Sequence, residues 1–199
     1  MSNRIQAIRR ASAKINALNT RIRETLRMRN RGPAEREEWS KACDEFHHLY
    51  PELSYPGGDK SLDALKRGES EAIETALDFL DADPVHFRSG YTKEVVWRRL
   101  RGASLTAGNK LRLEGIALRY VQRRIEREFW VMGRAMSKLA SNEFWQTAAK
   151  LADSAEEPIK TRAAYLLHYR DGVASGEQLR KKLSRERLMQ RYRERQSLI

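Results

Sequence analysis

The 199-residue sequence contains a single cysteine, Cys43. One cysteine cannot form an intramolecular disulfide or supply a four-cysteine zinc site, and such sparse usage is typical of a reducing cytoplasmic compartment. The sequence also lacks a run of about 18 apolar residues, the length that a membrane-spanning helix needs, and its first residues lack the apolar stretch of a secretory signal. We therefore expect a cytoplasmic protein that does not enter a membrane.

Motifs for common enzyme chemistry are also missing. The sequence has no P-loop, no Rossmann glycine pattern, no H-E-x-x-H and no G-x-S-x-G. Cys43, His47 and His48 lie within one predicted helix, and the four-residue spacing of Cys43 and His47 suits a metal site or a thiolate–imidazole pair. Core positions beside Trp39 and Phe46 are the alternative. We expect no enzyme, catalytic residue, cofactor or metal, and keep a hydrolase using Cys43, His47 and His48 as a further alternative.

What the sequence has in excess is positive charge: 39 Lys and Arg against 27 Asp and Glu, a net charge of +12. This charge is segregated along the chain. Residues 1–31 hold 9 basic and 1 acidic residues, residues 32–90 hold 6 and 14, and residues 91–150 hold 13 and 5. Residues 151–177 hold 3 basic and 5 acidic residues, and residues 178–199 hold 8 basic and 2 acidic residues. Solubility alone does not require such segregation, so we interpret the basic segments as binding surfaces.

Apolar residues return every three or four positions without sustained period-2 alternation, which predicts an all-α protein. We expect an array of antiparallel helical hairpins, either an irregular HEAT-like solenoid or a compact bundle, with basic N- and C-terminal helices. The irregular stretch 51–58 separates a basic hairpin (1–50) from a helical core (59–172), and a basic helix (173–199) follows. The pattern leaves open whether residues 107–140 form one helix or two.

A pair of short segments resembles a known group. The sequence reads FLDADP at residues 79–84 and FRSGYTKE at residues 87–94. It thus resembles a group of uncharacterised bacterial all-helical proteins that share an F-L-x-A-D-P … F-R-S-G-Y-x-K-E pattern. The resemblance covers residues 70–140 and implies a bacterial, helical protein, with no activity attached.

Within that segment, Arg88, Ser89 and Gly90 precede a helix that Thr92 is expected to cap. A cation and backbone N–H groups at a helix start are suited to binding an anion. The alternative is a tight loop in which Arg88 caps the preceding helix.

The pattern that most favours a binding function is a basic stripe. If residues 107–140 form one helix, six side chains fall within an arc of about 80°, opposite a heptad of apolar residues from Leu111 to Leu139. Guanidinium groups pair with phosphates, and an indole among them can stack on a base. A solvated polar face is the alternative, and a helix break near Glu126 would split the stripe. The six residues are Arg112, Arg119, Arg123, Arg127, Trp130 and Arg134.

The two terminal helices add further candidates. In the first helix they are Arg9, Arg10, Arg23 and Arg27, and in the last they are Arg185 and Arg191. Because like charges at this density repel, an anionic partner would stabilise them. We predict a non-enzymatic subunit or adaptor of a bacterial complex that binds DNA or RNA through these faces. Besides the hydrolase, two alternatives explain the basic faces: a protein-interaction module (scaffold, inhibitor or immunity protein) with an acidic partner, and self-neutralisation by the acidic segment 32–90.

Overall fold

The structure is a computed structural model of the chain, described for residues 2–123, 125–171, 181 and 184. Over these residues the secondary structure consists of helices without strands, which confirms the predicted all-α array. The chain forms two compact units, residues 1–104 and 105–199. The boundary between the units lies inside the segment 59–172 that we expected to be one core, and the N-terminal hairpin shares the first unit with the three helices that follow it.

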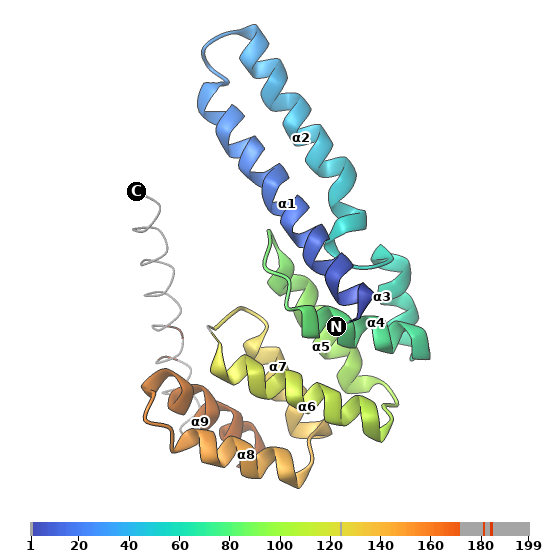
Figure 1. Cartoon of the computed structure of the whole chain (residues 1–199), viewed down its shortest axis with the longest axis vertical. Helices are drawn as coiled ribbons and strands as arrows, with labels where there is room; N and C mark the ends of the chain where they lie inside the picture. The colour runs from blue at the N-terminus through green and yellow to red at the C-terminus, as the bar shows by residue number, and fades with distance from the viewer. Residues whose placement is uncertain (1, 124, 172–180, 182–183, 185–199) are drawn as a thin grey trace. The chain divides into compact units, whose positions relative to one another are not determined.

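The first unit begins with a long helical hairpin and ends with three shorter helices (Figure 1). These helices are α1 (Asn3–Met28), α2 (Pro33–Ser54), α3 (Gly58–Arg67), α4 (Ser70–Ala82) and α5 (Ser89–Gly102). The Ser2 hydroxyl caps α1 by accepting from the Arg4 N–H, and Pro33 occupies the first turn of α2, where its missing N–H costs no helical hydrogen bond. The break at Gly32-Pro33 therefore produces the predicted hairpin.

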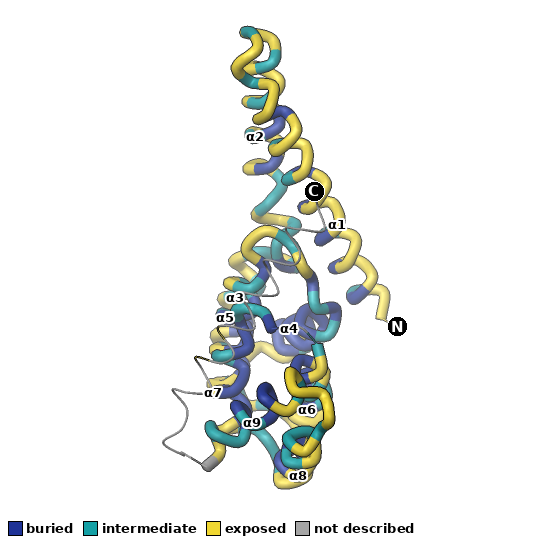
Figure 2. Tube along the Cα trace, turned by 90° about the vertical axis from the view of Figure 1, so that its left-hand side faces the viewer, coloured by how far each residue is buried: buried dark blue, intermediate teal, exposed yellow. Residues whose placement is uncertain are grey.

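The hairpin is held together at its base and has no core at its far end. Ile15 and Leu18 of α1 pack with Phe46 of α2 in a buried cluster. Residues 26–41 contain no buried side chain, as Figure 2 shows for that end of the hairpin. There the guanidinium of Arg29 lies 5.1 Å from the ring centroid of Trp39. The far end therefore offers mainly solvated side chains.

The core of the first unit centres on α4, which is buried over almost its whole length (Figure 2). At its end Asp83 adopts a left-handed conformation with φ 47°, which Asp tolerates better than most residues. Its carboxylate accepts a hydrogen bond from the Lys93 ammonium at 2.5 Å, and Lys93 is fully buried in α5. This ion pair fixes the turn that joins α4 to α5.

The second unit contains α6 (Ala107–Gln122), α7 (Phe129–Leu139), α8 (Asn142–Ala152) and α9 (Glu157–Asp171). Residues 107–140 thus contain two helices, and the described residues between Gln122 and Phe129 are not helical. Thr106 and Asn109 form a capping box at the start of α6. Ser141 caps α8, and its N–H donates to the buried Glu114 carboxylate at 2.6 Å. These caps fix where the helices start.

Candidate nucleic-acid interface

The first candidate surface is the basic exterior of α1, and part of it is neutralised within the protein. Arg4 pairs with Glu71 and, at 3.3 Å, with Asp78, while Arg21 pairs with Glu45 at 2.5 Å. All three carboxylates belong to the acidic segment 32–90. Self-neutralisation therefore operates at Arg4 and Arg21.

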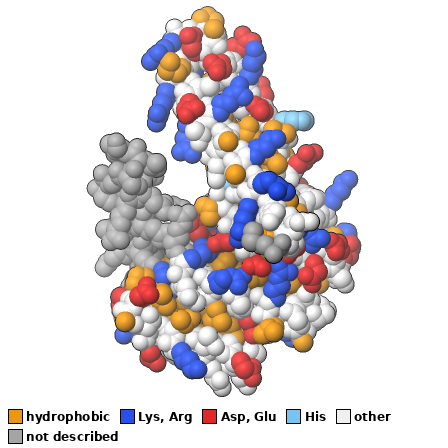
Figure 3. All heavy atoms as spheres, viewed as in Figure 1, with side chains coloured by type: hydrophobic (Ala, Val, Ile, Leu, Met, Phe, Trp, Pro, Cys, Tyr) orange, Lys and Arg blue, Asp and Glu red, His pale blue; other side chains and the backbone are white. Residues whose placement is uncertain are grey.

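Other cations of α1 remain available. Arg10, Lys14, Arg23 and Arg27 are exposed, and their side chains pair with none of the described residues. We call these four residues the α1 cations. In Figure 3, Lys and Arg side chains line the hairpin of α1 and α2, with Asp and Glu side chains among them. α1 is a continuous helix of 26 residues, about 39 Å long. At 100° per residue, Arg23 and Arg27 share one side of it, and Arg10 and Lys14 share another side about 140° away.

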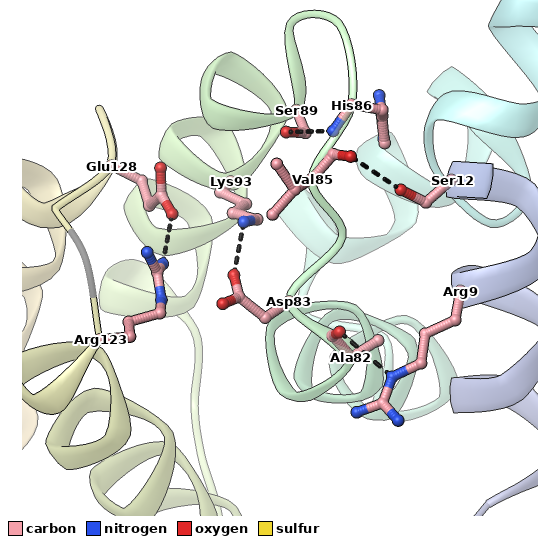
Figure 4. Close-up of polar contacts among 10 residues, drawn as sticks. All are labelled: Arg9, Ser12, Ala82, Asp83, Val85, His86, Ser89, Lys93, Arg123 and Glu128. Atoms are coloured by element: carbon pink, nitrogen blue, oxygen red, sulfur yellow. Dashed lines mark hydrogen bonds and ion pairs between the residues drawn. The ribbon is translucent and has the colours of Figure 1, made fainter. Parts of the chain in front are cut away.

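Arg9 has a structural role in addition to its charge. Its Nε donates to the carbonyl oxygen of Ala82 at 3.5 Å (Figure 4). Ala82 is the last residue of α4, and a guanidinium near a helix C-terminus satisfies an end carbonyl and interacts favourably with the helix dipole. Of the predicted binding residues on α1, Arg10, Arg23 and Arg27 thus differ from Arg9, which also holds α1 against α4.

The predicted stripe on residues 107–140 is divided between two helices. Arg112 and Arg119 lie on α6, Trp130 and Arg134 lie on α7, and Arg127 lies in the segment between them. Since α6 ends at Gln122, the single helical wheel that aligned these residues does not apply. Arg119 and Arg134 are exposed, whereas Arg112, Arg127 and Trp130 are half-buried.

Arg123 and Trp130 both make packing contacts inside the second unit. The Arg123 guanidinium lies 3.7 Å from the ring centroid of Tyr120, and its Nη2 pairs with the fully buried Glu128 carboxylate at 2.7 Å (Figure 4). The Trp130 ring meets Tyr165 edge-on, with centroids 5.1 Å apart. A planar group packed in this way has less of its surface left for a phosphate or base.

The apolar heptad opposite the stripe also differs from expectation. Leu111 is 71% exposed, although the heptad placed it on the buried face. The buried face of α6 instead follows the three- and four-residue spacing of an ordinary helix. Its apolar members are Leu113, Ile116, Ala117, Tyr120 and Val121.

The loop containing Arg88, Ser89 and Gly90 is organised by its own hydrogen bonds. Arg88 has φ 63° and stands at the N-cap of α5, which begins at Ser89 rather than at Thr92. The Ser89 hydroxyl is buried and accepts from the His86 N–H at 3.2 Å (Figure 4), while the Ser89 N–H donates to the His86 carbonyl. The Arg88 side chain is exposed, with its guanidinium 5.5 Å from the Tyr91 ring centroid.

Desolvation shifts the pKa of two aromatic side chains near this loop. Burial raises the pKa of the Tyr50 hydroxyl, an effect that the positive charge of Arg88 partly offsets. Burial also lowers the pKa of His86, and the charge of Lys93 acts in the same direction. Both shifts favour the neutral form of the group.

Cys43, His47 and His48 lie on α2 without converging. His47 and His48 are exposed, and Cys43 is half-buried. The His47 ring contacts the edge of Phe46, with centroids 5.8 Å apart. No group of three or more His, Cys, Asp or Glu residues suited to a metal ion occurs in the part of the chain that the structure describes.

Two predicted residues, Arg185 and Arg191, lie outside the described residues. Conversely, the predicted binding residues do not include Phe87 and Tyr91, two exposed aromatic residues beside Arg88. An aromatic residue within an Arg-Ser-Gly loop, away from any apolar periodicity, is the signal that could have identified them.

Nothing matches this chain in comparisons with family models, with curated proteins or with solved structures. Within the described residues, no helix has both the length and the apolar character needed to span a bilayer.

Proposed function

We propose that the protein is a non-enzymatic binding protein that holds the phosphate backbone of nucleic acid on the α1 cations. The observation that carries this proposal is the exposure of Arg10, Lys14, Arg23 and Arg27, which pair with none of the described residues. Phosphate oxygens provide the missing counter-charge, and arginine can contact a phosphate through two parallel N–H groups. The single cysteine and the resemblance noted above support a bacterial cytoplasmic setting for this binding.

The test is fluorescence anisotropy of the nuclease-treated protein with labelled single- and double-stranded DNA and RNA, over about 50 to 300 mM salt. The variant is Arg23→Gln/Arg27→Gln, which removes the two charges that share one side of α1. Each lost phosphate contact reduces the slope of log K against log salt by about 0.9 on duplex DNA, so the double variant loses about 1.8.

A matched control removes the same charge elsewhere. Lys138 and Lys150 are exposed, pair with no described residue, and lie in the last turns of α7 and α8, as Arg27 lies in the last turn of α1. The variant Lys138→Gln/Lys150→Gln is expected to keep the wild-type slope. Equal losses in both variants would indicate non-specific attraction by net charge and would refute a site on α1.

A protein-binding role is the second candidate function. It is favoured by Leu26 and Met28, large apolar side chains that are exposed at the coreless end of the hairpin. A protein site there predicts that Leu26→Ser abolishes capture of an acidic partner. The α1-cation proposal predicts that this variant leaves the affinity for nucleic acid unchanged.

A further inference from the structure

The loop between α4 and α5 is fixed by its backbone to both helices of the hairpin. The Val85 carbonyl accepts from the Ser12 hydroxyl at 3.2 Å and from the Asn16 side-chain amide at 2.8 Å, and both donors lie on α1 (Figure 4 shows the first). The Phe87 carbonyl accepts from the Tyr50 hydroxyl of α2 at 3.1 Å. Three hydrogen bonds therefore hold residues 85–87 in place.

This fixed loop and the first turn of α5 expose large apolar side chains. Val85 is 44% exposed, Phe87 48% and Tyr91 49%. The Phe87 ring is also supported from beneath: its centroid lies 5.8 Å from that of Phe46 and 6.1 Å from that of Tyr50. An aromatic ring that is rigid, half exposed and close to others is suited to contact with a flat partner.

Arginine interrupts the apolar surface. Arg88 lies between Phe87 and Tyr91 in the chain, and its guanidinium faces the Tyr91 ring at 5.5 Å. A guanidinium plane is itself a surface on which a nucleic-acid base can stack. The patch therefore offers cationic and aromatic groups side by side, which fits a base and its phosphate better than a purely apolar protein surface.

The loop also lies next to the side of α1 that carries two of its cations. Asn16, which holds Val85, and Arg23 are seven residues apart, so they are separated by about 20° around the helix and about 10.5 Å along it. Arg27 follows one turn further on the same side. A strand whose bases reach Phe87 and Tyr91 can therefore place its backbone along α1 toward Arg27.

We propose that Phe87, Arg88 and Tyr91 form a base-stacking site for single-stranded nucleic acid, an inference that rests on the function proposed for the α1 cations. Bases in a duplex are stacked on one another and present no free faces, whereas unpaired bases do. The site therefore selects single strands over duplexes, while the α1 cations bind the backbone of either.

The experiment compares two ligands that differ only in their bases: a 15-nucleotide thymidine strand and an abasic strand with the same phosphates. Phe87→Leu and Tyr91→Leu each remove a ring and keep an apolar side chain, so position 87 keeps an apolar group that can contact Phe46 and Tyr50. We expect each variant to weaken thymidine binding by about fivefold or more and to leave abasic binding unchanged. Phe87→Tyr keeps the ring and is expected to bind as the wild type does. A deoxyuridine strand and a uridine strand run in parallel differ only in the 2′-hydroxyl, so they distinguish DNA from RNA as the preferred source of the bases.

Each outcome decides between the two proposals. If the leucine variants bind both strands as the wild type does, the stacking site is refuted while the α1 proposal stands. If the wild type binds neither strand at low salt, the α1 proposal fails. If the leucine variants keep nucleic-acid affinity but Arg88→Glu abolishes capture of a protein, the patch is a protein-docking surface and the stacking site is refuted.

Discussion

Gly133 marks a place where two helices of the second unit approach too closely for any larger residue. A Cβ added to Gly133 in α7 would lie 2.6 and 2.7 Å from two ring carbons of Tyr169 in α9, and 3.6 Å from Leu166. Moving the Tyr169 ring aside has a cost, because its hydroxyl lies 2.5 Å from that of Tyr165, within hydrogen-bond distance. Gly133→Ala therefore forces the two helices apart or rotates the ring.

Two opposing contributions determine the change in unfolding free energy. Replacing a mid-helix glycine by alanine stabilises the helix by about 1 kcal/mol. Overpacking of this kind costs about 1 to 3 kcal/mol. Gly115, in the middle of α6, isolates the first contribution, because its added Cβ would come no closer than 3.8 Å to the end of the Arg119 side chain. Gly115→Ala should therefore be about 1 to 3 kcal/mol more stable than Gly133→Ala.

The assay is urea unfolding monitored by far-UV circular dichroism. Both variants lie in the second unit, so their unfolding free energies can be compared directly. Adding Tyr169→Leu removes the ring, and in that background Gly133→Ala should stabilise the unit as Gly115→Ala does. The resulting coupling energy should be about 1 to 3 kcal/mol. A coupling energy near zero, or a Gly133→Ala variant as stable as Gly115→Ala, would show that the close approach of α7 and α9 does not exist.

Three further changes test other parts of the fold. Ile15→Ala removes a fully buried side chain from the hairpin core and should destabilise the first unit by about 2 to 5 kcal/mol in urea unfolding. Burial lowers the pKa of His86 below its ordinary value of 6.5, so the contribution of neutral His86 to stability is complete above that pH and is lost as the pH falls through the folded-state pKa. The unfolding free energy of His86→Gln should therefore depend less on pH below 6.5 than that of the wild type. Ser141→Ala removes the cap of α8 and the contact of its hydroxyl with Glu114, and should cost about 1 to 2 kcal/mol in thermal or urea unfolding.

The sequence predicted helix boundaries well where residues at the boundary itself determine them. We expected a basic hairpin over residues 1–50, and its first helix spans Asn3–Met28, because a serine cap starts it and Gly32-Pro33 prevents its continuation. The end of α6 has no such signal, since no glycine or proline lies between Gln122 and Phe129.

That end depends instead on contacts from distant parts of the chain. The Val121 carbonyl is one of the last in α6 and lacks a partner within the helix. It accepts a hydrogen bond at 2.6 Å from Nε of Arg162, a buried residue of α9 that lies 41 positions later. An arginine that caps a helix from such a distance does not alter the apolar spacing of residues 107–140. That spacing is therefore equally compatible with one helix and with two.

The same break changes which arginines are available for binding, and Arg123 provides the test. The charge pattern assigned it to a binding stripe, but in the structure it covers Tyr120 and pairs with the buried Glu128. Arg123→Gln should therefore destabilise the second unit by about 1.5 to 3 kcal/mol, the range for hydrogen bonds to charged groups, and leave nucleic-acid affinity near that of the wild type. Arg23→Gln on α1 should do the reverse, because Arg23 is exposed and pairs with no described residue. If instead Arg123→Gln lost binding at unchanged stability, the stripe predicted from the sequence would be the binding surface, and the assignment to α1 would be wrong.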